Sequence, residues 1–122
     1  MGGNFWTRQE LIEKARTGEI QQPKYAQKWS VLKQSDHCTL FAADIGAPKG
    51  YPLHVHHHHD EVMIVLDGEG EAAVGTEKRK VKQGDVIFVP RGTAHTLRFA
   101  GQLLAIDCPT FDTGNPDRAI VE

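Results

Sequence analysis

Apolar residues at helical spacing occur near the start of the chain. Thr7 and Glu10 have the spacing of a capping box, in which each side chain accepts a hydrogen bond from a free backbone donor. Leu11, Ile12 and Ala15 then fall on one face, and the glycine three residues later is a suitable end. The pattern predicts a short helix that needs a packing partner to persist.

Further along, the pattern changes to short runs of β-type residues that alternate with turns. Glycine, proline and the pairs Asp67-Gly68 and Gly84-Asp85 separate the runs. Many short strands at near-even spacing are typical of a sandwich or a closed barrel. The expected strands are residues 29–32, 38–45, 53–56, 61–66, 71–74, 78–82, 86–89, 95–99 and 103–107.

Length and composition narrow the class of protein. The 122 residues fit one domain, and 14 basic against 16 acidic residues argue against a nucleic-acid or membrane partner held by charge. The longest apolar run, residues 62–66, is too short to span a bilayer, and the N-terminus lacks the pattern of a secretory signal. Cys38 and Cys108 are distant in sequence and are expected as two reduced thiols. These features predict a soluble, cytoplasmic protein.

A histidine-rich segment carries the most specific chemistry. His54 and His56 alternate along a predicted strand, so their side chains share one face. Glu61 opens the next strand and can return a carboxylate to the same place. Two imidazoles and a carboxylate suit a borderline divalent metal ion. Alternatively, the consecutive histidines form an exposed polar loop with adventitious metal affinity.

A second segment, residues 84–95, favours the specific site. A Gly-Asp turn leads into an apolar strand, Pro90 and Gly92 form another turn, and His95 starts the following strand. A lone histidine in this position is more often an ordinary core or rim residue. Beside the first cluster, His95 becomes a candidate fourth ligand from a separate strand.

The two segments resemble the two signature motifs of the cupin family. Four residues separate the His-x-His pair from the glutamate, and six more precede a glycine. In the second segment, five residues separate a glycine from Pro-x-Gly, and two more precede the histidine. The family's opening glycine of the first motif and closing asparagine of the second are replaced here by Pro48 and Phe99. The matching positions are His54, His56, Glu61 and Gly68, then Gly84, Pro90, Gly92 and His95.

The resemblance implies an all-β fold, the cupin double-stranded β-helix or jelly-roll barrel, with a short N-terminal helix. The expected organisation is a helical segment at residues 1–27, a barrel at 28–108 and a C-terminal tail at 109–122. The resemblance also implies one divalent transition metal ion, namely Fe, Mn, Ni, Cu, Co or Zn, with coordination positions left open for water or substrate. The implied ligands are His54, His56, Glu61 and His95.

Apolar residues are expected around this metal. Met63, Val65 and Leu97 share the inward face of their strands with Glu61 and His95, and they either line a pocket or simply fill the interior. Phe99 is expected as a pocket wall or a core aromatic. The remaining histidines are expected on the surface, at positions 37, 57, 58 and 59.

Two classes of function follow from these expectations. The first is a small metalloenzyme, such as a dioxygenase, isomerase or lyase, that acts on a small organic acid, sugar or phenolic compound. The second is a non-catalytic module that binds a small molecule. Fold alone does not choose between them. A homodimer is expected, because small cupins commonly pair through their sheets and a β-type run near the start of this chain could cross to a partner.

Overall fold

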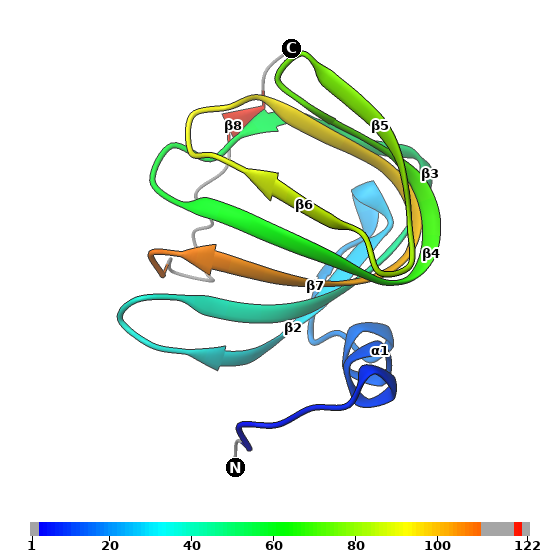
Figure 1. The fold of residues 1–122 in the computed structure, drawn as a ribbon. Helices are drawn as coiled ribbons and strands as arrows, with labels where there is room; N and C mark the ends of the chain where they lie inside the picture. Colours follow the sequence, from blue (N-terminus) through cyan, green and yellow to red (C-terminus); the bar gives the residue numbers. More distant parts are fainter. Residues whose placement is uncertain (1–2, 111–118, 121–122) are drawn as a thin grey trace.

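The computed structural model describes residues 3–110 and 119–120, and most of them lie in antiparallel strands (Figure 1). The side chains of residues 47–51 and 119–120 are outside this description. In chain order the elements are α1 (Arg8–Arg16), β1 (Ile20–Gln22), the 3-10 turn η1 (Pro23–Tyr25), β2 (Gln27–Gln34), β3 (Thr39–Val55), β4 (Asp60–Val74), β5 (Glu77–Lys82), β6 (Val86–Val89), β7 (His95–Cys108) and β8 (Ala119–Ile120).

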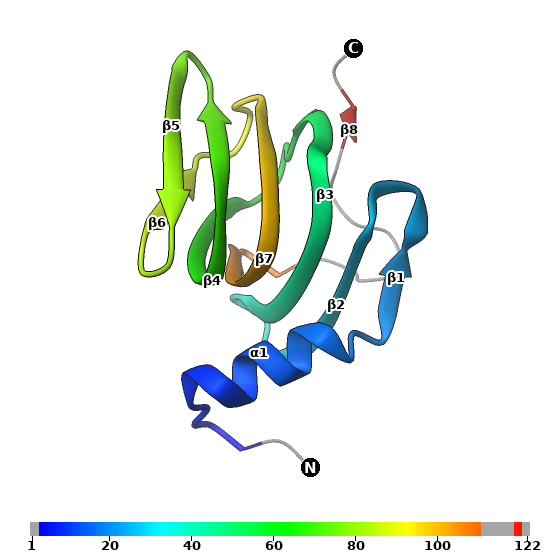
Figure 2. The same cartoon turned by 90° about the vertical axis from the view of Figure 1, so that its right-hand side faces the viewer.

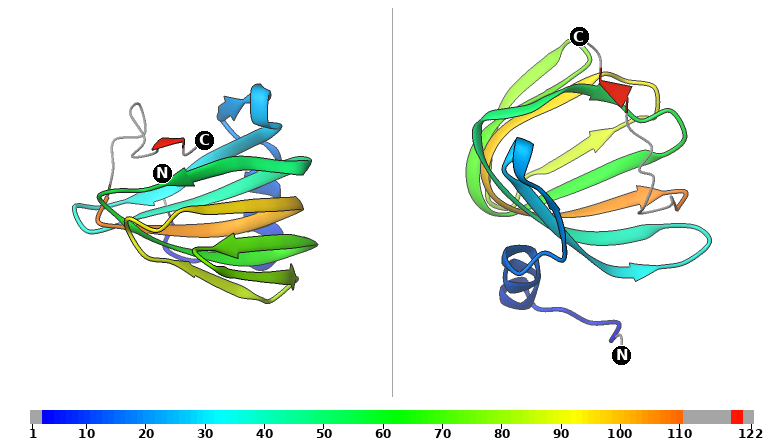
Figure 3. Two further views of the ribbon diagram at one scale, coloured as in Figure 1. Left: turned by 90° about the horizontal axis from the view of Figure 1, so that it is seen from above. Right: turned by 180° about the vertical axis from the view of Figure 1, so that it is seen from behind.

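The strands form one sheet that rolls up on itself. Its order is β1-β2-β3-β7-β4-β5, with β6 beside β4 and β8 beside β3. Figures 1 and 3 show the sheet bending so that its two halves face each other. Among the described strands, no pairing joins the outer strands β1 and β5, so the sheet is not closed into a barrel. The predicted all-β architecture is confirmed in this open form.

Three long strands, β3, β4 and β7, run through both halves of the rolled sheet (Figure 1). The sequence pattern predicted each as two separate strands, and this was wrong. Gly68 and Gly101 pair with each other at the bend with positive φ angles of 99° and 149°. A Cβ atom on Gly68 would collide with the Ala100 carbonyl oxygen, and one on Gly101 with that of Asp67. These glycines therefore mark a corner inside continuous strands, where two backbones cross closely.

The main core lies between the two halves of the sheet. The four residues proposed to line a pocket all belong to this buried cluster, together with Trp29, Phe41 and other apolar side chains. Their interior position follows from the alternation of inward and outward side chains along β4 and β7. They are Met63, Val65, Leu97 and Phe99.

The predicted helix is confirmed as α1, which packs on the outside of the sheet (Figure 2). The Thr7 hydroxyl accepts a hydrogen bond from the Glu10 backbone at 3.1 Å, and the Glu10 carboxylate accepts one from the Thr7 backbone at 2.8 Å. Leu11 and Ile12 are buried against Leu66 in a second, smaller cluster. Each such side chain contributes about 1.5–3 kcal/mol through burial, which explains why so short a helix persists.

Some boundaries differ from the prediction. The helical segment expected at residues 1–27 also contains β1 and η1, and β1 pairs with β2 as a hairpin. The expected tail, residues 109–122, lies largely outside the described residues. Of this tail, Ala119 and Ile120 pair with the end of β3. No helix in the part of the chain that the structure describes has the length and apolar character needed to cross a membrane.

Candidate metal centre

Three histidines from two adjacent strands meet at one end of the rolled sheet. His54 near the end of β3 lies opposite His95 at the start of β7, and their ring centroids are 4.0 Å apart. His56, one residue beyond β3, lies with its ring centroid 5.0 Å from that of His54 and 4.8 Å from that of His95. All three side chains are buried. The paired strands thus place the predicted histidines together.

Backbone contacts hold the two histidine-bearing loops against each other. The Gly92 amide donates to the His56 carbonyl oxygen at 2.7 Å, and the Arg91 amide donates to the Asp60 carboxylate at 2.8 Å. Gly92 has a φ angle of 78°, and the Thr93 amide donates to the Pro90 carbonyl oxygen at 3.2 Å across this turn. Glycine provides the left-handed conformation at the third position of the turn. The Pro-x-Gly sequence therefore docks one loop on the other directly before His95.

The orientation of two imidazole rings is fixed by backbone carbonyl groups. Nδ1 of His54 lies 2.7 Å from the Pro52 carbonyl oxygen, and Nδ1 of His95 lies 3.1 Å from that of Thr93. A carbonyl oxygen only accepts, so each Nδ1 carries the proton and each Nε2 presents a lone pair. Nε2 of His95 is buried and makes no hydrogen bond within the described part of the chain. This arrangement is typical of histidines that bind a metal ion.

Glu61 brings a carboxylate from the other half of the rolled sheet. Its Oε1 lies 3.6 Å from Nε2 of His56 and 4.0 Å from Nε2 of His95. Burial alone raises the pKa of Glu61, but contacts with His56 and Asp107 and the nearby imidazoles outweigh it and lower the pKa. The carboxylate is therefore ionised inside the protein, where a cation would stabilise it.

The electrostatics of the site keep His54 and His95 neutral. Burial, followed by the neighbouring His95, lowers the pKa of His54 to about 3. Burial also lowers the pKa of His95. Neutral imidazole is the form that binds a metal ion.

The spacing of the donor atoms suits a single ion. Ligand atoms of His54, His56 and His95 lie within 4.8 Å of one another, and so do those of His56, His59 and Glu61. An ion about 2.0–2.2 Å from each nitrogen or oxygen holds its donors at most about 4.4 Å apart, so small side-chain adjustments bring these donors onto one ion. The residues present fit a divalent metal ion in donor type, protonation and spacing.

Comparison with known proteins places the chain in a family. The sequence profile of the cupin domain matches residues 45–107, more than half of the chain. The chain belongs to the cupin family. The matched region contains all four proposed ligands and the two segments that resembled the family's motifs.

The relatives that match this cupin include an uncharacterized protein and a named enzyme. An uncharacterized protein of Aquifex aeolicus is 42% identical over 62 residues, which are 48% of this cupin and 51% of that protein. Quercetin 2,3-dioxygenase of Bacillus subtilis is 38% identical over 53 residues, which are 43% of this cupin and 16% of the dioxygenase. The matches thus span about half or less of these relatives.

A solved structure shows that the likeness extends to the whole fold. Streptomyces Pac13 with uridine, described as a nucleoside dehydratase, superimposes with a TM-score of 0.74 at 18% identity, covering 100% of this cupin and 93% of that chain. At this identity the comparison establishes the fold. The cupin fold predicted from the sequence is confirmed.

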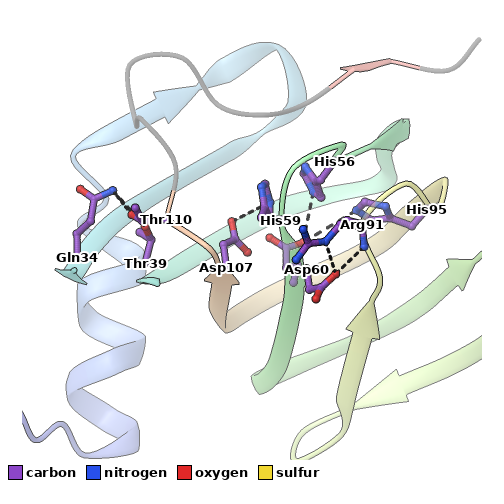
Figure 4. A network of polar contacts seen from close by, with 10 residues as sticks. Gln34, Thr39, His56, His59, Asp60, Arg91, His95, Asp107 and Thr110 are labelled. Carbon is purple, nitrogen blue, oxygen red and sulfur yellow. Dashed lines mark hydrogen bonds and ion pairs between the residues drawn. The ribbon is translucent and has the colours of Figure 1, made fainter. Parts of the chain in front are cut away.

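His59 of this cupin was expected on the surface, and this was wrong. Its side chain is 2% exposed, stacks on His56 with ring centroids 4.4 Å apart, and places Nε2 3.3 Å from Oδ2 of Asp107 (Figure 4). His57 and His58 are exposed, as predicted, and so is His37. His59 lies two residues before Glu61. A predicted strand that began at His59 would therefore have placed the two side chains on the same face.

Asp107 was missed by the sequence analysis altogether. It is 2% exposed on β7 and lies directly opposite Glu61 of β4. Every second residue of β7 from His95 to Phe99 and from Leu103 to Asp107 faces the interior. An acidic residue that continues an inward apolar series is the signal that could have identified it.

Proposed function

We propose that this cupin holds one divalent transition metal ion through His54, His56, Glu61 and His95 and acts on a small organic substrate as a dioxygenase, isomerase or lyase. The observation that carries the proposal is the convergence of three buried imidazoles and an ionised carboxylate, with two of the imidazoles oriented by backbone carbonyl groups. The donor set suits Fe, Mn, Ni, Cu, Co or Zn.

The protein's own groups would hold and orient the reacting molecule. When bound, a metal ion would supply Lewis acidity toward a substrate oxygen, and iron would add chemistry with dioxygen. Four protein ligands leave coordination positions open in an octahedral arrangement. His59, stacked on His56 and paired with Asp107, places further polar groups beside the proposed ligands. This pair supports an enzyme because a reaction needs groups beyond those that hold the ion.

The apolar side chains near the site favour a small, partly apolar substrate. Met63, Val65, Leu97 and Phe99 are proposed to line the pocket, since they lie on the interior face of the strands that carry Glu61 and His95. Two similar proteins are named as enzymes of small molecules, a quercetin dioxygenase and a nucleoside dehydratase. Neither name identifies the substrate of this cupin.

Two further features belong to the same proposal. A homodimer formed through the sheet fits the small size of the chain, and light scattering over a wide concentration range tests it, with a constant monomer mass as the contradicting result. A cytoplasmic location fits the two cysteines expected to be reduced.

Turnover by defined metal forms tests the proposed function. Protein loaded separately with Fe, Mn, Ni or Zn is incubated with a panel of small organic acids, sugars and phenols, while oxygen uptake and product mass are followed. A dioxygenase requires iron and consumes oxygen, whereas a lyase or isomerase accepts several ions and consumes none. Turnover should depend on the ion, because catalysis requires stabilisation of a transition state.

Two variants separate catalysis from ligand binding. Glu61→Ala should abolish turnover. Asp60→Asn, which alters the adjacent residue outside the proposed ligand set and keeps an oxygen acceptor for the Arg91 amide, should retain it. Ligand binding without any product, in every metal form and with or without oxygen, would instead establish the non-catalytic binding module.

A further inference from the structure

The two cysteines of the chain, far apart in sequence, meet on the outer side of the rolled sheet. Cys108 is the last residue of β7, and Cys38 directly precedes β3. Thr39 pairs with Asp107 in the antiparallel register of these strands, so the next facing positions are Cys38 and Cys108. The Cys38 side chain lies close enough to that of Cys108 to raise the pKa of the Cys108 thiol.

The register also determines which way the thiols point. Thr39 is 0% exposed and Asp107 is 2% exposed, so both face the interior. Successive side chains alternate across a strand, and the cysteines one position further on therefore face outward. Cys38 is partly exposed and Cys108 is exposed. Small molecules in solution can therefore reach both thiols.

The distance between directly facing residues suits a disulfide bond. Cβ atoms of such pairs lie about 4.5–5.5 Å apart, and a disulfide needs a Cβ separation of about 3.5–4.5 Å with a Cα separation of about 4.4–6.8 Å. Bridging therefore requires a small rotation of the side chains and no rearrangement of the backbone.

We propose that Cys38 and Cys108 form a modification site that a hydroperoxide oxidises to an intramolecular disulfide. One thiolate attacks a peroxide oxygen, the O–O bond breaks, and a sulfenic acid and one water form with uptake of a proton. The second thiol attacks the sulfenic sulfur, the S–O bond breaks, and the S–S bond forms as the second water leaves. With hydrogen peroxide, two thiols thus give one disulfide and two waters.

The surroundings of the thiols set the character of this reaction. Burial, the adjacent Cys38 and the carboxylate of Asp60 raise the pKa of the Cys108 thiol. Little of it is thiolate at neutral pH, so oxidation is slow. Oxidation that begins at Cys108 therefore requires sustained exposure to peroxide, and the bond formed acts as a stabilising crosslink.

The bond would connect the ends of two long strands beside the candidate metal centre. It closes a loop of about 70 residues, and a crosslink of that span should raise the melting temperature by roughly 5–15 °C. Asp107, the residue before Cys108, contacts His59, so the crosslink also fixes one border of the site.

Oxidation of the full-length reduced protein with hydrogen peroxide tests the site. The expected product is a monomer lighter by about 2 Da, a single crosslinked peptide containing Cys38 and Cys108, and the increased melting temperature. Cys38→Ser and Cys108→Ser should each show neither the loss of mass nor the increase. Reduction of the oxidised wild-type protein should reverse both, which keeps the test independent of how the variants fold.

Other products would overturn the proposal. Oxygen adducts on separate thiols, crosslinks between two chains, or an oxidised monomer with an unchanged melting temperature would each show that the two cysteines react independently or that their bond constrains nothing.

Discussion

Two neighbouring rows of residues lie across the ends of β3, β7 and β4, and they differ by a single step along the chain. The inner row is Thr39, Asp107 and Glu61, and the outer row is Cys38, Cys108 and Asp60. The members of the inner row face one another in the strand register, and so do Asp60 and Cys108; Cys38 directly precedes β3 and faces Cys108 by continuation of that register. The members of the inner row are 0%, 2% and 7% exposed, whereas the outer row lies toward solvent.

The comparison shows how the pleat of a sheet assigns chemistry to similar side chains. Asp60 and Glu61 are adjacent carboxylates, and contacts with Arg91 lower the pKa of Asp60 in the presence of solvent. Glu61 is held inside, where an uncompensated charge is costly and where His56, His95 and Asp107 lie close to it. The outer carboxylate therefore secures a loop, and the inner one is available to a metal ion.

The largest expected effect comes from replacing one carboxylate in each row by its neutral amide and comparing the two variants. Glu61→Gln should weaken metal binding by at least about 100-fold, because a charged ligand becomes a neutral amide. Asp60→Asn should change it less than about threefold, since Asp60 lies on the outer side. Competition titration with a chromogenic chelator measures both affinities, and equal losses in the two variants would contradict the distinction between the rows.

An intermediate effect is expected one strand away. Asp107→Asn should weaken metal binding by roughly 10- to 100-fold, because the partner that orients His59 beside His56 is lost. Cys108→Ser, the next residue in the outer row, should leave the affinity unchanged. The same chelator titration compares them. Wild-type affinity in Asp107→Asn would show that the His59–Asp107 pair has no part in the site.

The buried histidines also predict a dependence of stability on pH in metal-free protein. The pKa of His54 is lowered to about 3 in the folded state, so between about pH 6.5 and 3 the unfolded chain binds more protons. The free energy of unfolding should therefore fall as the pH drops below about 6.5, and a shift of this size corresponds to a few kcal/mol over the whole range. Carboxylates stay ionised down to about pH 5, so above that pH the histidines account for most of the change in the free energy of unfolding.

Denaturant unfolding at pH 7 and pH 5 in the presence of a chelator measures this slope. His54→Gln should flatten it, and His58→Ala, which alters an exposed residue, should leave it as in the wild type. An identical slope in His54→Gln and wild type would contradict the neutral, buried state assigned to His54.

The sequence predicted the parts of the site that depend on local spacing. His54, His56, Glu61 and His95 were selected by strand alternation and by two motifs. The structure groups the three histidines and places Glu61 beside His56 and His95. The short helix was recognised because its cap is encoded within four residues. Such predictions were possible because the signals lie within a few residues of one another.

The missed features depend on contacts between distant strands. Asp107 becomes part of the site through its pairing with Glu61, and Cys38 meets Cys108 through the register of β3 and β7. Gly68 and Gly101 were interpreted as turns because glycine indicates an unusual φ angle but does not show whether the chain reverses or bends. Pairing and curvature are properties of the folded sheet, which no single segment encodes.

The metal content of the purified protein tests the central claim most directly. Untagged wild-type protein and two variants, His95→Ala and His58→Ala, are purified from cells grown without added metal. Elemental analysis measures the number of metal ions per chain. The four-residue site predicts one ion per chain in the wild type and in His58→Ala, and almost none in His95→Ala. Full metal content in His95→Ala, or its loss in His58→Ala, would show that the exposed histidine loop binds the metal instead.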